Sequence, residues 1–93
     1  MTQAGRHYVV LIVPSALKEL VALPKKPMRQ VDEMIKDLAT DPRPPWSRKL
    51  KGRAQGLHRV DSGDFRAIYA IDDRGLTVTV TKIGNRRDVY RGL

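Results

Sequence analysis

The sequence predicts an α+β fold in which two helices pack on one face of a mainly antiparallel four-stranded sheet. The first half of the chain has one apolar, β-branched run followed by two stretches in which apolar residues recur at helical spacing. The second half has stretches of alternating apolar and polar residues, separated by short glycine-containing turns. The order β-α-α-β-β-β keeps the helices together and leaves the other face of the sheet partly open.

Residues 6–13 are predicted to form a buried strand, because this short β-branched run is bounded by Pro14. Ser15 is the predicted N-cap of a short helix over residues 16–21, which Pro24 ends. A second helix follows, with Pro27 in its first turn. Its apolar stripe consists of Met28, Val31, Ile35 and Leu38, and Met34 is expected to be a further packing residue.

Residues 41–45 contain three prolines and predict a stiff connection, because each proline forces its predecessor toward an extended conformation. Trp46 follows, and we expect it to cap the core from a loop. A strongly basic segment comes next. Its four cations are Arg48, Lys49, Lys51 and Arg53.

Residues 57–61 and 64–69 predict a β-hairpin closed by Ser62 and Gly63, since glycine supplies the positive φ of a tight turn. This loop sets Asp61 opposite Asp64 and Arg59 opposite Arg66. The core face then consists of His58, Val60, Phe65, Ala67, Tyr69 and Ile71.

Two facing arginines on the polar side of a hairpin destabilise it unless an anion lies between them. Arg59 and Arg66 therefore indicate an anion-binding site. The alternative is that both are ordinary surface cations neutralised by Asp61 and Asp64.

Residues 76–83 alternate cleanly and predict the last strand, after a turn at residues 72–75. If Asp72 faces Gly75, then Val78 faces Tyr69 and Thr81 faces Arg66. The chain then leaves the sheet through a segment short enough to keep Arg86 near the arginine face.

The composition narrows the class of protein. Ninety-three residues make one small domain over residues 1–93, and the absence of cysteine excludes disulfides and thiolate metal sites. The longest apolar run has six residues, too few for a membrane span or a secretion signal, so a cytoplasmic location is expected. A net charge of +8, concentrated after residue 45, favours a nucleic-acid partner.

Four segments together carry a family resemblance: residues 49–52, residues 58–60, residues 63–69 and residues 83–90. Taken in this order, they resemble the RelE/ParE superfamily of type II toxin–antitoxin toxins over essentially the whole chain. The resemblance implies a RelE-like fold with a short C-terminal tail or helix. For the RelE branch it also implies a metal-independent and cofactor-free endoribonuclease, which cleaves mRNA in the A site of the 70S ribosome.

Residue by residue, the resemblance assigns the catalytic set to Arg59, Arg66, Arg86 and Tyr90. The implied reaction is attack of a ribose 2′-hydroxyl on the adjacent phosphate, which leaves a 2′,3′-cyclic phosphate and a free 5′-hydroxyl. Arginine suits such a site because its planar fork grips two phosphate oxygens and keeps its charge. The tyrosine would stack on a base or relay a proton.

One position departs from the family pattern. Where RelE-type enzymes carry a second basic residue, this chain has Asp61. It is a candidate proton acceptor, particularly if Asp64 raises its pKa, but it would also repel phosphate. His58 points to the core face and is expected to be structural.

The cations assigned to RNA backbone binding are Arg48, Lys49, Lys51, Arg53 and Arg87. The resemblance also implies a cognate antitoxin in a toxin–antitoxin hetero-oligomer, and we expect it to dock on the helix pair and the sheet edge. Three functions remain open at this point. They are a ribosome-dependent RNase, a ParE-like poison of DNA gyrase, and a non-catalytic basic module that binds nucleic acid.

Overall fold

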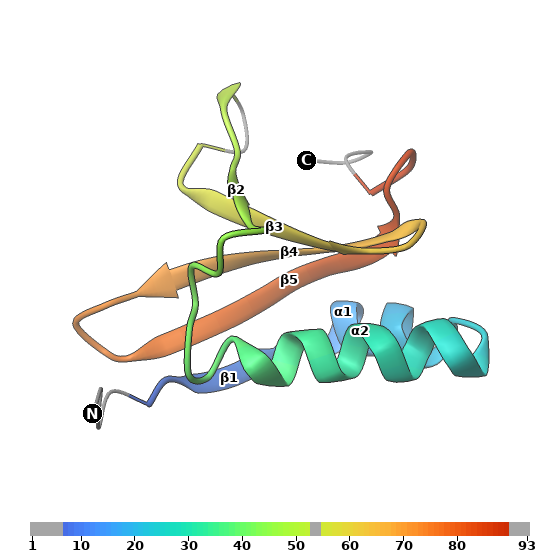
Figure 1. The fold of residues 1–93 in the computed structure, drawn as a ribbon, viewed down its shortest axis with the longest axis horizontal. Helices are drawn as coiled ribbons and strands as arrows, with labels where there is room; N and C mark the ends of the chain where they lie inside the picture. The colour runs from blue at the N-terminus through green and yellow to red at the C-terminus, as the bar shows by residue number, and fades with distance from the viewer. Residues whose placement is uncertain (1–6, 53–54, 90–93) are drawn as a thin grey trace.

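The computed structural model describes residues 7–52 and 55–89 and confirms the α+β fold (Figure 1). Its five strands form one sheet in the order β1-β5-β4-β3-β2, with both helices on one face. The elements are β1 (Val9–Ile12), α1 (Pro14–Val21), α2 (Lys25–Asp37), β2 (Arg48–Lys49), β3 (Leu57–Ser62), β4 (Phe65–Asp72) and β5 (Thr77–Asn85). The strand that the four-stranded prediction lacked is β2, whose two residues are too few to show any alternation. No helix within the described ranges is long and apolar enough to cross a membrane.

Strand β1 lies at an edge of the sheet and is not buried, so this part of the prediction was wrong. It pairs in parallel with β5 alone, and its outward side chains Val9 and Leu11 are 60% and 51% exposed. Val10 and Ile12 pack against the core. An apolar run alone does not distinguish a central strand from an edge strand whose outer face is also apolar.

The two helices follow the predicted order. Helix α1 starts at Pro14, with Val13 as its N-cap, so the expected Ser15 cap was wrong. Proline is favoured in the first helical position, where its missing N–H costs nothing. Helix α2 buries Val31 and Ile35, and both predicted packing methionines contact the core cluster.

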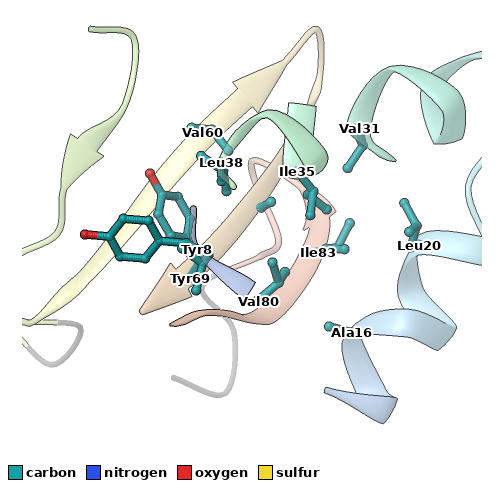
Figure 2. Packing of buried hydrophobic residues seen from close by; sticks show 12 residues of the cluster. Tyr8, Ala16, Leu20, Val31, Ile35, Leu38, Val60, Tyr69, Val80 and Ile83 are labelled. Carbon is teal, nitrogen blue, oxygen red and sulfur yellow. The ribbon is translucent and has the colours of Figure 1, made fainter. Parts of the chain in front are cut away.

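The core lies between the helices and the inner face of β3, β4 and β5 (Figure 2). The predicted core face of the hairpin is confirmed, because Val60, Ala67 and Tyr69 are all fully buried. His58 stacks on Tyr69 with ring centroids 5.6 Å apart. The Tyr69 hydroxyl donates a 2.7 Å hydrogen bond to the carbonyl of Pro42, which ties the proline-rich connection to the sheet.

The turn between β4 and β5 is longer than predicted. Asp72 faces Thr77, and its carboxylate accepts hydrogen bonds from the backbone N–H groups of Arg74 and Gly75. The expected pairing of Val78 with Tyr69 was therefore wrong, and Val78 faces Ile71. A bulge then shifts the register beside residues 68 and 69, which brings Gly84 rather than Thr81 opposite Arg66.

Candidate functional site

The face of the sheet opposite the helices carries the predicted arginines, but in a different register. Strands β3 and β4 are joined by residues 63–64, so that Asp61 faces Arg66 and Arg59 faces Ile68. Gly63 has a φ of 59°, which places the glycine first in the two-residue loop rather than second. Because the register differs by two residues, every side chain keeps its predicted face.

Asp61 binds both arginines. Its Oδ1 accepts a 2.6 Å hydrogen bond from Nε of Arg66, and its Oδ2 accepts bonds from Nη2 of Arg66 at 3.0 Å and Nη1 of Arg59 at 2.7 Å. The side chains of Arg59, Asp61 and Arg66 are 26%, 28% and 12% exposed. We call these three residues the arginine–aspartate triad. Charge-assisted bonds of this kind are among the strongest in proteins.

The triad changes the chemistry expected of Asp61. The hydrogen bond from Arg66 is the largest cause that holds the pKa of the Asp61 carboxyl below its ordinary range, although partial burial opposes it. Asp64 is exposed in the loop and does not face Asp61, so its expected role in raising this pKa was wrong. A carboxylate with a lowered pKa is a weak proton acceptor at neutral pH.

A different pair of arginines faces across the strands. Arg48 of β2 lies opposite Arg59 of β3, so β2, β3 and β4 each bring one arginine to the open face. The guanidinium of Arg48 donates to the carbonyls of Pro45 and Ser47, and its side chain is exposed. The sequence contained one signal for this pair: a dense run of cations directly before the hairpin.

The chain after β5 returns over the open face. A Cβ at Gly84 would lie 3.9 Å from Cγ2 of Val89, and Gly84 is the cross-strand partner of Arg66. Val89 is buried, and Figure 1 shows its turn on the side of the sheet away from the helices. The turn at residues 86–89 is therefore held beside the triad.

Arg86 lies in this turn, where its backbone N–H donates to the carbonyl of Asp64 at 3.0 Å. A small pocket of about 260 Å³ is lined by Asp64, Asn85, Arg86 and Arg87. In the described part of the chain, no hydrogen bond or ion pair links Arg86 directly to the triad. The structure thus brings Arg86 to the same end of the open face as the triad, close to the β3–β4 loop. Tyr90 lies outside the described residues.

The basic segment after Arg48 forms a surface separate from the triad, and its Lys49 is the cross-strand partner of His58. Lys49 and Lys51 are exposed and line a pocket of about 500 Å³ with Leu50, Gly52 and neighbouring residues. Arg53 lies outside the described residues. The assignment of this segment to RNA binding stays a prediction.

Another pocket lies elsewhere and carries the opposite charge. It has a volume of about 700 Å³ and lies between α2 and the β3–β4 loop. Its described lining includes Glu33, Asp37 and Asp41 and no lysine or arginine. Trp46 is 60% exposed in this pocket, so its expected role as a core cap was wrong. Pro42 and Pro44 are the buried residues of the connection instead.

No group of three or more potential metal ligands occurs in residues 7–52 and 55–89. The triad itself consists of two guanidinium groups that donate hydrogen bonds to one carboxylate.

Comparison with known proteins identifies the class of protein. Residues 10–90 match the family described as the ParE toxin of the type II toxin–antitoxin system parDE, and the chain belongs to this family. It is a RelE-like type II toxin. The toxin RelE of Mycobacterium tuberculosis is 31% identical over 84 residues, which cover 90% of this chain and 87% of the relative.

Solved structures agree with this assignment. The toxin–antitoxin complex RelBE2 of Mycobacterium tuberculosis contains a chain with a TM-score of 0.77 and 27% identity, covering 86% of this chain and 99% of that one. The archaeal RelE–RelB complex of Pyrococcus horikoshii gives a TM-score of 0.75 and 30% identity, with 86% and 96% covered. Isolated RelE of Escherichia coli shares the fold at 22% identity, with a TM-score of 0.72 and 84% and 83% covered.

Proposed function

We propose that this toxin is a ribosome-dependent endoribonuclease that cleaves mRNA in the A site without a metal ion. The observation that carries the proposal is the convergence of Arg48, Arg59 and Arg66 from three successive strands on one open face. Such a face suits the phosphate backbone of RNA, which is the substrate that RelE-type chemistry requires. The site of action would be the cytoplasm, where ribosomes translate mRNA.

The proposed chemistry uses a nucleophile that the RNA supplies. The 2′-hydroxyl attacks the adjacent phosphorus, the bond to the 5′-oxygen breaks, and the products end in a 2′,3′-cyclic phosphate and a 5′-hydroxyl. The protein has to align these atoms and stabilise the charge that gathers on the phosphorane. Arg59, Arg66 and Arg86 supply that charge, and Tyr90 contributes stacking or proton relay.

A primer-extension assay on a defined mRNA tests this proposal, with purified toxin and with or without ribosomes programmed by the same message. We expect cleavage only with ribosomes. Arg66→Ala and Arg86→Ala should each lower the cleavage rate by about 100-fold, the usual loss when one donor to the transition state is removed.

Arg74→Ala provides the matched control, because Arg74 is an exposed turn arginine at the opposite end of β4 and β5. It should cleave at the wild-type rate. Cleavage that survives both Arg66→Ala and Arg86→Ala would contradict the proposed site. RNA binding without any cleavage by the wild type would indicate a non-catalytic binding module.

A second candidate function is inhibition of DNA gyrase, as in ParE-like toxins. Asp61 favours it, because this carboxylate neutralises two of the arginines on which RNA cleavage would depend. A gyrase supercoiling assay with the same protein preparation separates the two functions. Inhibition of supercoiling together with no mRNA cleavage would establish gyrase as the target.

We also propose a cognate antitoxin as partner, docked on the helix pair and the free sheet edge. The structural support lies at β1, which is an edge strand of the described sheet and exposes Val9 and Leu11. Helix α1 packs against β5 beside this strand and exposes Leu17 and Val21, one helical turn apart. Exposed apolar residues in pairs on a small domain favour a protein interface.

A further inference from the structure

The arginine–aspartate triad already holds an anion. Asp61 presents two oxygens to two guanidinium groups, through three hydrogen bonds of 2.6 to 3.0 Å. A phosphodiester presents two non-bridging oxygens to the same kind of fork. The donors that an RNA phosphate would use are therefore occupied by a side chain of the protein itself.

We propose that Asp61 is an internal competitor for the phosphate position: an RNA phosphate binds between Arg59 and Arg66 only when the Asp61 carboxylate leaves it. This inference rests on the proposed function, in which these arginines bind RNA. It goes further by assigning Asp61 a role in setting the RNA affinity of the site, where a role in proton transfer was expected.

The electrostatics of the triad support competition rather than joint binding. A phosphate that entered beside an ionised Asp61 would share two cations with another anion at close range, and like charges at such distances repel strongly. The lowered pKa of Asp61 shows that its carboxylate keeps its charge near neutral pH, so protonation does not relieve this repulsion.

The geometry allows the exchange. Asp61 is 28% exposed, near the loop end of the hairpin, so its side chain has solvent on one side into which it can rotate. Arg66 is only 12% exposed and remains fixed in the sheet. Rotation of this one short side chain would therefore remove its carboxylate from both guanidinium groups without movement of the backbone.

The test is the affinity of purified full-length toxin for a short single-stranded oligoribonucleotide, made uncleavable by 2′-deoxy substitution. Fluorescence anisotropy without ribosomes measures binding alone. Asp61→Asn keeps the shape of the side chain and removes its charge. We expect it to bind the oligonucleotide about tenfold more tightly than wild type. The slope of log affinity against log salt should steepen by about 0.7, the value for one further phosphate bound on a single strand.

Asp37→Asn is the matched control, because it makes the same change in net charge on α2, on the other face of the molecule. Its affinity should stay within about twofold of wild type on general electrostatic grounds. If Asp61→Asn binds no more tightly than Asp37→Asn, the competitor role is wrong. Weaker binding by Asp61→Asn would show that Asp61 positions the arginines instead.

A second measurement needs no variant and covers the case in which Asp61→Asn fails to fold. The carboxyl carbon of Asp61 can be followed by NMR in the wild-type protein as the oligonucleotide is added. We expect its chemical shift to move toward that of an unpaired carboxylate at saturation. A shift that remains at the value of the free protein would overturn the proposal.

The outcomes separate this inference from the proposed function. Tight binding by Asp61→Asn with no cleavage by the wild type would support the competitor and refute the RNase. Cleavage by the wild type with unchanged binding by Asp61→Asn would support the RNase and refute the competitor role of Asp61. Absence of oligonucleotide binding to the wild type and both variants would refute the phosphate site and the competitor together.

Discussion

At the scale of single residues, His58 and Asp61 belong to the same hairpin but lie in different environments. They lie three positions apart on β3, so their side chains emerge on opposite faces of the sheet. His58 is stacked in the core against Tyr69, and Asp61 is held between two arginines on the open face. Both have lowered pKa values, from burial in one case and from hydrogen bonding in the other.

The lowered pKa of His58 predicts a pH-dependent stability. Burial is its largest cause, and the charges of Arg43 and Lys49 add to it. The unfolded chain takes up a proton near the ordinary histidine pKa of about 6.5, whereas the folded protein does not. The free energy of unfolding should therefore fall as the pH drops below about 6.5, until the folded histidine also titrates.

His58→Phe should keep the stack on Tyr69 and abolish the fall in the free energy of unfolding at low pH. Urea unfolding at pH 7.5, 6.0 and 5.0 measures this free energy. His7→Gln is the control, since His7 is the exposed histidine of the chain. The control should lose stability with falling pH as the wild type does. An equal loss in His58→Phe would assign the effect to other groups.

Asp61 contributes to stability in a lower pH range. Its pKa is lower in the folded state than in the unfolded chain, so its contribution is complete above the ordinary aspartate pKa of about 4. This contribution to stability is lost as the pH falls further and passes the lowered pKa of Asp61 in the folded state. His58 and Asp61 therefore make the free energy of unfolding depend on pH in separate pH ranges.

At the scale of helices and strands, α1 offers a direct test of the antitoxin surface. Leu17→Glu with Val21→Glu places two carboxylates on an exposed apolar pair without touching the buried Ala16 or Leu20. We expect antitoxin affinity, measured by isothermal titration, to fall at least about tenfold, because both groups must be desolvated at the interface. Lys18→Ala, on the same helix, should change it by less than about threefold.

Unchanged affinity in the double variant would remove α1 from the interface. A loss of affinity in Lys18→Ala as large as in the double variant would point to general charge effects. Circular dichroism of each variant shows whether α1 remains helical.

The element scale also shows what the sequence could predict. Helical spacing located α2 and its buried residues, and alternation located β3, β4 and β5 with the correct faces. The hairpin register could not be predicted, because Ser62-Gly63 and Gly63-Asp64 are both acceptable two-residue loops with glycine at a position of positive φ. The choice between them decides whether Arg66 faces Arg59 or Asp61.

The sequence predicted which residues of the triad share a face of the sheet, but not which of them contact one another. Alternation placed Arg59, Asp61 and Arg66 on one face, and any register shifted by two residues preserves that result. The pairing of Arg48 with Arg59 was missed because β2 has only two residues. Ion pairs depend on side-chain geometry across strands, which periodicity does not contain.

At the scale of the whole molecule, charge is divided between surfaces. The chain carries +8 overall, yet the pocket beside α2 is lined by three acidic residues and by no described cation. If the toxin acts on the ribosome as proposed, nucleic acid should approach the open face and the basic segment rather than this acidic pocket. The salt dependence of the affinity for ribosomes measures this electrostatic contribution.

Neutralising Lys49 and Lys51 together should lower the slope of log affinity against log salt by about 0.7 to 0.9 for each phosphate that a lysine no longer neutralises. Both side chains are exposed, so their replacement by glutamine leaves the core intact. Lys25→Gln with Lys26→Gln, on α2, is a control of equal charge. An unchanged slope in the Lys49 and Lys51 variant would exclude the basic segment from the interface.

The parallel pairing of β1 with β5 has a consequence for the order of folding. Val9 and Thr77 are neighbours in the sheet although 68 positions separate them in the chain. During synthesis, β1 has no strand to pair with until β5 has emerged, because β5 is its neighbour in the sheet. Contacts between such distant positions also close slowly. A chain interrupted before β5 thus lacks the partner of its first strand, as well as the turn that carries Arg86.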